Sequence, residues 1–108
     1  NELKNTSLKL PFQKFDYKHV FHLYVVYHPK RDQIIKKLKK KKIGININYP
    51  FPVHKMKAYN NTVCDDCNCL PLTEKFAKGV FSLPLYPSLK SSDIFKISKI
   101  IKNIINKT

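Results

Sequence analysis

Residues 19–28 have the sequence HVFHLYVVYH. β-Branched and aromatic side chains fill it, which predicts a β-strand that is buried on both faces over most of its length. Pro29 ends that strand. Residues 30–42 then change period. Their apolar side chains, Ile34, Ile35 and Leu38, fall on one helical face, and lysines surround that face. This pattern predicts a helix.

The rest of the chain again mixes strand and helix patterns. Residues 43–48 alternate apolar with small or polar side chains, which predicts a strand with one buried face. Two prolines make residues 49–52 a stiff, extended loop. Helices are expected over residues 72–81 and from Ser91, where Ser91, Ser92 and Asp93 supply a cap and an isoleucine stripe follows: Ile94, Ile97, Ile101, Ile104 and Ile105. The order β-α-β-loop-α-α predicts an α/β fold, a small sheet with helices packed on one face.

Size and composition narrow the class of protein. The 108 residues are enough for one domain, and 43% are hydrophobic, which allows a real core. No apolar run is long enough to span a bilayer and no secretory leader opens the sequence, so we expect a cytoplasmic protein with no membrane partner. Three cysteines, an odd number, argue against a closed disulfide framework.

The net charge of +14 first suggests a nucleic-acid partner. Arg31 is the only arginine among the 21 basic residues, although the guanidinium fork of arginine is the group best suited to phosphates and base edges. Lysine, isoleucine and asparagine share A/T-rich codons, so genome composition can explain much of the excess. We therefore favour a solvated basic surface, with a stand-alone lysine-rich nucleic-acid-binding module as the alternative.

The cysteines form a C-x-x-C-x-C motif at Cys64, Cys67 and Cys69. Thiolates at such spacing can chelate zinc, which needs a fourth ligand, and His54 is the nearest candidate. A second C-x-x-C pair is missing from the sequence. We therefore prefer three reduced thiols in a surface loop, and a zinc-stapled interaction domain is kept as a weak alternative.

Titratable and aromatic groups gather in the first half of the chain. His22 and His28 share a face of the expected strand, where either one is more simply a satisfied core or edge histidine. The segment Tyr49–His54 mounts a phenol, a phenyl ring and an imidazole on a backbone stiffened by two prolines. From the residues alone, this segment is equally well a binding loop or an apolar plug over one end of the sheet.

Five collinear motifs resemble the C-terminal domain of the DegT/StrS family, which are pyridoxal-phosphate-dependent aminotransferases acting on keto groups of nucleotide-linked sugars. The resemblance covers about residues 18–106. The motifs are His22-x-Tyr24, Pro29-x-Arg31-Asp32, Ile43-Gly44-x-x-x-Asn48-Tyr49-Pro50-x-Pro52-x-His54 with Ala58-Tyr59, Leu70-Pro71-x-Thr73-Glu74, and Ser82-Leu83-Pro84-Leu85-Tyr86-Pro87.

The resemblance implies a division of labour between two domains. A preceding large domain would carry the Schiff-base lysine, most of the pyridoxal phosphate contacts and the homodimer interface. Residues 1–17 would lead in from that domain, and residues 18–108 would be the small C-terminal α/β domain, similar to that of fold-type I transferases. This chain alone would then hold no cofactor, carry no catalytic residue and be inactive.

The same resemblance assigns the candidate binding residues. Tyr49 would contact the nucleotide-sugar substrate, with Asn48 and His54 beside it and His22 as a supporting strand residue. The family usually has histidine where this chain has Asn48, which cannot titrate. It usually has glycine where this chain has Lys42, so a left-handed Lys42 would carry strain on the order of 1 kcal/mol.

Overall fold

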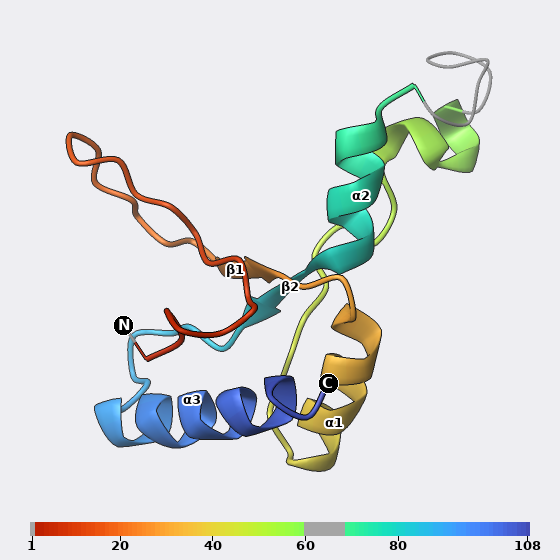
Figure 1. The fold of residues 1–108 in the computed structure, drawn as a ribbon. Helices are drawn as coiled ribbons and strands as arrows, with labels where there is room; N and C mark the ends of the chain where they lie inside the picture. Colours follow the sequence, from red (N-terminus) through yellow and green to blue (C-terminus); the bar gives the residue numbers. More distant parts are fainter. Residues whose placement is uncertain (1, 60–68) are drawn as a thin grey trace.

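The computed structural model describes residues 2–59 and 69–108. Its two strands, β1 (Tyr24–Tyr27) and β2 (Val80–Leu83), form a small antiparallel sheet. The α-helices are α1 (Arg31–Lys40), α2 (Pro71–Gly79) and α3 (Ser91–Ile105), and two short 3-10 turns, η1 (Val53–Lys55) and η2 (Lys57–Tyr59), precede α2. Figure 1 shows α1 and α3 together below the sheet. Helix α2 lies above it and leads directly into the first residue of β2.

The sheet is wider than its two strands. Val26 pairs with Phe81 in the centre of the β1–β2 register. Lys9 and Tyr27 exchange backbone hydrogen bonds on the outer side of β1, and Asn46 and Ser82 do the same outside β2. Four segments therefore lie side by side, and Asn46 brings the loop that follows it to the edge of β2.

One apolar core joins the sheet to the two helices below it. Val26 and Phe81 point to the same face, where they are fully buried. Their partners come from α1, α3 and the first residues of the chain, and the remaining core residues are Leu3, Leu8, Ile34, Ile35, Leu38, Ile43, Ile101, Ile104 and Ile105. The predicted α/β class, with helices packed on a small sheet, is confirmed. The stripe predicted for α1 and the last three isoleucines of the stripe predicted for α3 lie in the core, whereas Ile94 is exposed.

Helix α1 ends in a Schellman motif. Lys42 has a left-handed φ of 58°. The amide of Lys42 donates to the carbonyl of Lys39, and the amide of Ile43 donates to the carbonyl of Leu38. Lysine therefore occupies the position that glycine would fill without strain, as the sequence indicated.

Several expected boundaries are wrong. The strand predicted over residues 19–28 is limited to Tyr24–Tyr27 and only one of its residues, Val26, is fully buried. Phe21 has a φ of 47°, which no strand residue adopts, and the segment before it projects away from the sheet (Figure 1). Apolar side chains of that segment, such as Phe15, are exposed to solvent.

Three further expectations need correction. The strand predicted at residues 43–48 is an isolated bridge at Asn46. The helix predicted over 72–81 ends at Gly79, and β2 follows it directly. The residue that caps α3 is Lys90, with no side-chain hydrogen bond, instead of the predicted Ser91–Asp93. The amides of Asp93 and Ile94 donate to the Lys90 carbonyl, so backbone alone closes the first turn.

Candidate functional site

The segment from Asn48 to Lys55 is held at both ends by the α2–β2 unit. At its beginning, the amide oxygen of Asn48 accepts a hydrogen bond of 2.9 Å from the hydroxyl of Ser82 on β2. At its far end, His54 and Lys55 both contact the carboxylate of Glu74 on α2. We call this segment the Tyr49 loop, and its proline-stiffened middle spans the distance between the two anchors.

Tyr49 itself combines a fixed backbone with a free side chain. Its φ of 59° is left-handed, a conformation that costs a non-glycine residue about 1–2 kcal/mol. Its side chain is nevertheless 81% exposed. Backbone strain beside an exposed phenol is a combination found at binding sites.

An open hollow of about 390 Å³ lies beside Tyr49 on the sheet face opposite the core. Val25, Val80 and Ser82 form its floor from the two strands. Asn48 and Tyr49 lie on its wall, and most of the other lining residues are apolar: Leu23, Phe51, Pro52, Val53, Met56, Thr73, Ala77 and Phe81. The hollow therefore offers an apolar surface with a few polar groups at its edge, which is the usual make-up of a ligand site.

His54 does not line this hollow. Its side chain is 5% exposed, and its Nε2 lies 3.2 Å from Oε1 of Glu74, while Lys55 Nζ donates to Oε2 of Glu74 at 2.7 Å. The hydrogen bond from Lys55 is the main cause that lowers the pKa of Glu74, and the bond from His54 adds to it against the opposing effect of burial. The structure thus brings Asn48 and Tyr49 together and places His54 in an anchor behind them.

His22 lies outside the predicted strand. It is exposed in a bend two residues before β1, so the expectation of a supporting strand residue is wrong. His28 directly follows β1 and is buried. Its Nδ1 accepts from the amide of Lys30 and its Nε2 lies 3.0 Å from the hydroxyl of Ser7, so the neutral ring with its proton on Nε2 satisfies both contacts.

The described residues provide no support for a zinc site. Cys64 and Cys67 lie outside the described residues, and Cys69 is disulfide-bonded, which differs from the expected reduced thiol. His54, the proposed fourth ligand, already bonds Glu74. Within residues 2–59 and 69–108, no three His, Cys, Asp or Glu side chains form a metal-binding group.

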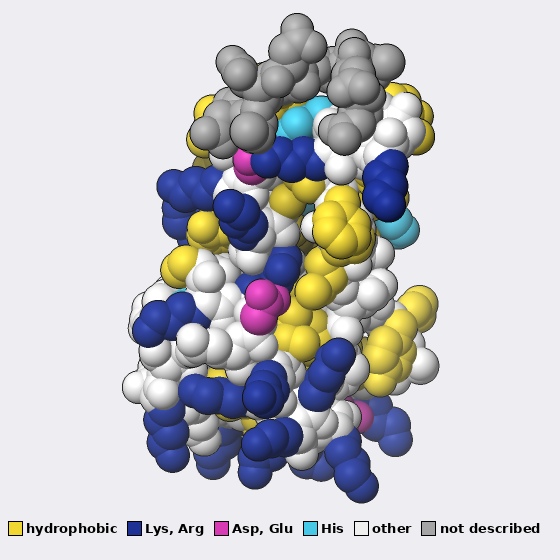
Figure 2. All heavy atoms as spheres, turned by 90° about the vertical axis from the view of Figure 1, so that its right-hand side faces the viewer, with side chains coloured by type: hydrophobic (Ala, Val, Ile, Leu, Met, Phe, Trp, Pro, Cys, Tyr) yellow, Lys and Arg dark blue, Asp and Glu magenta, His cyan; other side chains and the backbone are white. Residues whose placement is uncertain are grey.

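The basic surface is separate from the hollow. Figure 2 shows lysine side chains gathered over the lower part of the face that carries α1 and α2, with an apolar strip among them. The guanidinium of Arg31 is not part of an exposed phosphate-binding surface, because its side chain is only 12% exposed and it binds the Ala77 carbonyl and Asp32. This arrangement ties α1 to the end of α2 and weakens the nucleic-acid alternative.

A match to a family of known proteins covers residues 1–102 of this chain. The chain belongs to the DegT/DnrJ/EryC1/StrS aminotransferase family. It is 40% identical, over 92% of its length, to a dTDP-3-amino-3,4,6-trideoxy-alpha-D-glucose transaminase of Micromonospora megalomicea subsp. nigra, and 31% identical, over 96% of its length, to a UDP-N-acetyl-3-dehydro-alpha-D-glucosamine 3-aminotransferase of Acidithiobacillus ferrooxidans. It spans only 26% and 27% of these relatives, about a quarter of each.

Solved structures of the DegT/DnrJ/EryC1/StrS family share the fold. S. venezuelae DesV in complex with a ketimine intermediate matches 99% of this chain and 29% of its own, with a TM-score of 0.91 and 28% identity. A family aminotransferase from Brucella abortus matches 96% of this chain and 27% of its own, with a TM-score of 0.85 and 26% identity. The two-stranded sheet, its flanking bridges and the helices are therefore the fold of one part of these longer enzymes.

Pyridoxal phosphate, which the aminotransferase family implies, does not fit the residues that line the Tyr49 hollow. The cofactor needs a desolvated lysine amine and an acid beside its pyridine nitrogen. No lysine or carboxylate is among the residues that line the Tyr49 hollow, and none of the lysines in the described ranges is buried. We therefore derive no step of the reaction through the cofactor from this chain.

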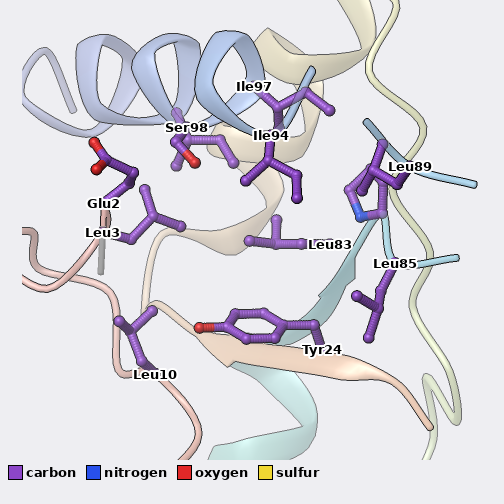
Figure 3. A pocket seen from close by; sticks show the side chains of 12 residues that line it. Glu2, Leu3, Leu10, Tyr24, Leu83, Leu85, Leu89, Ile94, Ile97 and Ser98 are labelled. Atoms are coloured by element: carbon purple, nitrogen blue, oxygen red, sulfur yellow. The ribbon is translucent and has the colours of Figure 1, made fainter. Parts of the chain in front are cut away.

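A second apolar pocket, of about 230 Å³, lies on the core side of the sheet in this family member. Figure 3 shows Tyr24 and Leu83 on the sheet side of it, with Ile94 and Ile97 of α3 opposite and Leu3 at one end. It contains none of the predicted site residues.

Among the described residues, no helix is long and apolar enough to cross a membrane.

Two residues that hold the Tyr49 loop cannot be identified from the sequence. Glu74 and Ser82, the anchors of the Tyr49 loop, both occur in the motifs that carry the resemblance. Nothing in the local sequence pairs them with residues that lie 20 and 34 positions earlier. The sequence signal for Glu74 is that it is the one carboxylate of α2, in the first turn of a helix that otherwise carries lysines.

Proposed function

We propose that this chain is the small domain of a pyridoxal-phosphate-dependent aminotransferase that aminates a keto group of a nucleotide-linked sugar. In this proposal the domain forms one wall of the substrate cleft, and another part of the enzyme supplies the cofactor and the reactive lysine. The observation that carries it is the exposed phenol of Tyr49 on a pinned, left-handed backbone beside an apolar hollow. The family membership and the printed activities of the relatives support the substrate class.

Each site residue has a distinct part in this proposal. The phenol of Tyr49 donates or accepts a hydrogen bond with the substrate, and its ring covers part of the sugar-nucleotide. The amide oxygen of Asn48 is taken by Ser82, so its NH₂ group remains as a donor toward the substrate. Asn48 does not transfer a proton. His54 supports the loop from behind, because its imidazole faces Glu74.

The remaining parts of the proposal concern the whole enzyme. We propose that residues 1–17 connect this domain to a large domain while also packing on it, since Leu3 and Leu8 lie in the core. A homodimer formed through the large domain and a cytoplasmic location complete the proposal. Closing this domain over the cleft would exclude water from the reacting groups.

The test compares Tyr49→Phe and Tyr49→Ala in the enzyme that carries this chain, with nucleotide-linked keto-sugars and an amino donor. Loss of one hydrogen bond in Tyr49→Phe should raise KM for the sugar nucleotide about three- to ten-fold, and loss of the ring in Tyr49→Ala should raise it further. Tyr86→Phe is the matched control, because Tyr86 is also exposed but does not line the hollow.

Two results would contradict the proposal at different levels. A protein that transfers no amino group to any nucleotide-linked keto-sugar refutes the function. An active enzyme in which both Tyr49 variants keep the original KM refutes the site.

A further inference from the structure

Glu74 is a buried carboxylate that the proposed reaction does not use. Its side chain is 9% exposed and lies in the first turn of α2. One carboxylate oxygen faces His54 Nε2 at 3.2 Å, and the other accepts from Lys55 Nζ at 2.7 Å. Both partners are consecutive residues of η1, so a single side chain holds the whole turn.

The same turn ends the Tyr49 loop. The amide of Lys55 donates to the carbonyl of Pro52, and the amide of Met56 donates to that of Val53, which closes the turn directly after the prolines. Because prolines restrict the backbone between Tyr49 and this turn, a displacement of the turn is passed along the loop. The other end is fixed by Asn48 on Ser82.

We propose that Glu74 is a positioning residue that sets where Tyr49 stands at the edge of the hollow by holding the far end of its loop through His54 and Lys55. This proposal rests on the proposed function of Tyr49. Glu74 is not among the residues that line the hollow. It therefore acts on substrate binding only through the loop.

Removing the carboxylate has a local consequence. Glu74→Ala leaves the buried imidazole of His54 and the ammonium of Lys55 without this acceptor, so η1 loses its attachment to α2. Glu74→Gln keeps the volume and one acceptor oxygen but loses the charge. Glu74 is not part of the apolar core in which α1 and α3 pack, so we expect these two helices to keep their packing in both variants.

The first measurement is amide hydrogen exchange on the protein, which needs no activity. In Glu74→Ala the amides of Lys55 and Met56 should lose protection at least about ten-fold, with a smaller loss in Glu74→Gln, while α1 and α3 keep theirs. Asp93→Ala is the matched control, because it removes a carboxylate that faces a lysine, Lys96, away from the loop.

The second measurement is a double-mutant cycle on KM for the sugar nucleotide. Glu74→Ala should raise KM about five-fold or more when Tyr49 is present and less than about two-fold in the Tyr49→Ala background.

Three results overturn the positioning role. The first is unchanged amide exchange at Lys55 and Met56 in Glu74→Ala. The second is a loss of protection throughout α1 and α3 that equals the loss at Lys55 and Met56. The third is a rise in KM on Glu74→Ala that is equal with Tyr49 present and in the Tyr49→Ala background. An enzyme without aminotransferase activity would refute the proposed function, while the exchange experiment still decides whether Glu74 holds the loop.

Discussion

The hydroxyl of Ser82 donates to the amide oxygen of Asn48 at 2.9 Å, across 34 residues of sequence. Two residues earlier, the backbone of Asn46 pairs with the backbone of the same serine. A single residue of β2 thus holds the base of the Tyr49 loop by both its backbone and its side chain. This attachment fixes one end of the loop that carries Tyr49 beside the hollow.

Removal of either partner should weaken the protein. Asn48→Ala and Ser82→Ala should each lower the free energy of unfolding by about 0.5–1.5 kcal/mol, because a part-buried hydrogen bond is lost. Urea unfolding of the two single variants and the double variant measures this. The double variant should lose less than the sum, and strict additivity would show that the bond contributes nothing.

Gly79 permits the close approach of α2 to the end of β1. A Cβ at this position would lie 2.3 Å from a ring carbon of Tyr27 and 3.0 Å from the carbonyl of His28. Gly79→Ala should therefore lower the free energy of unfolding by about 1–3 kcal/mol. Gly44→Ala is the control, since nothing lies within 4 Å of its Cβ, and it should leave stability unchanged or slightly raised. Equal effects in thermal unfolding would contradict this account of Gly79.

Lys42 occupies the left-handed position of the Schellman motif at the end of α1. Lys42→Gly should raise the free energy of unfolding by about 0.5–1 kcal/mol, because the relief of strain exceeds the added flexibility of the unfolded chain. Lys41→Gly, one residue earlier at a φ of −91°, should lower it. Denaturant unfolding that shows the same sign for both would exclude strain at Lys42.

His28 makes stability depend on pH. Burial, followed by the charge of Lys30, lowers the pKa of His28 below its ordinary value of 6.5. The unfolded chain then binds a proton more readily than the folded one, so this part of the stability is present above pH 6.5 and is lost as pH falls through the lowered pKa. His28→Gln should flatten the fall of Tm below pH 6.5, and His22→Gln, at an exposed position, should not. An unchanged pH profile in His28→Gln would refute this assignment.

Glu74 acts in a more acidic window. Its pKa is lowered from 4.5, mainly by the hydrogen bond from Lys55, so its contribution is present above pH 4.5 and is lost as pH falls through the lowered value. Glu74→Gln should remove this second, acidic loss of Tm and leave the loss due to His28 in place. Thermal unfolding measured across both pH windows separates the two residues, and a Glu74→Gln variant that changed only the upper window would contradict the assignment.

The sequence predicts the helices better than the sheet. Helices α1 and α3 follow from their own apolar period, which is a local property. Strand β2 cannot be recognised from the local sequence, because Val80 and Phe81 continue the apolar period of α2 and Pro84 follows shortly after. Its strand identity comes from pairing with Tyr24–Tyr27, more than fifty residues earlier, and no local pattern records such a partner.

The candidate site divides in the same way. Two prolines and the family motif indicate the loop that carries Asn48 and Tyr49. The anchors are tertiary contacts to Ser82 and Glu74, so the sequence could not separate an exposed Tyr49 from a buried His54 five residues later. The family resemblance assigns both residues to the substrate, and only the packing of α2 distinguishes them.

The proposed function can be tested by the intact mass and the visible absorption spectrum of the protein isolated from its natural source. The proposed function predicts a chain of about four times 12.7 kDa, because this domain spans 26% of a relative, with the yellow colour of bound pyridoxal phosphate. A colourless native protein of 12.7 kDa would contradict it.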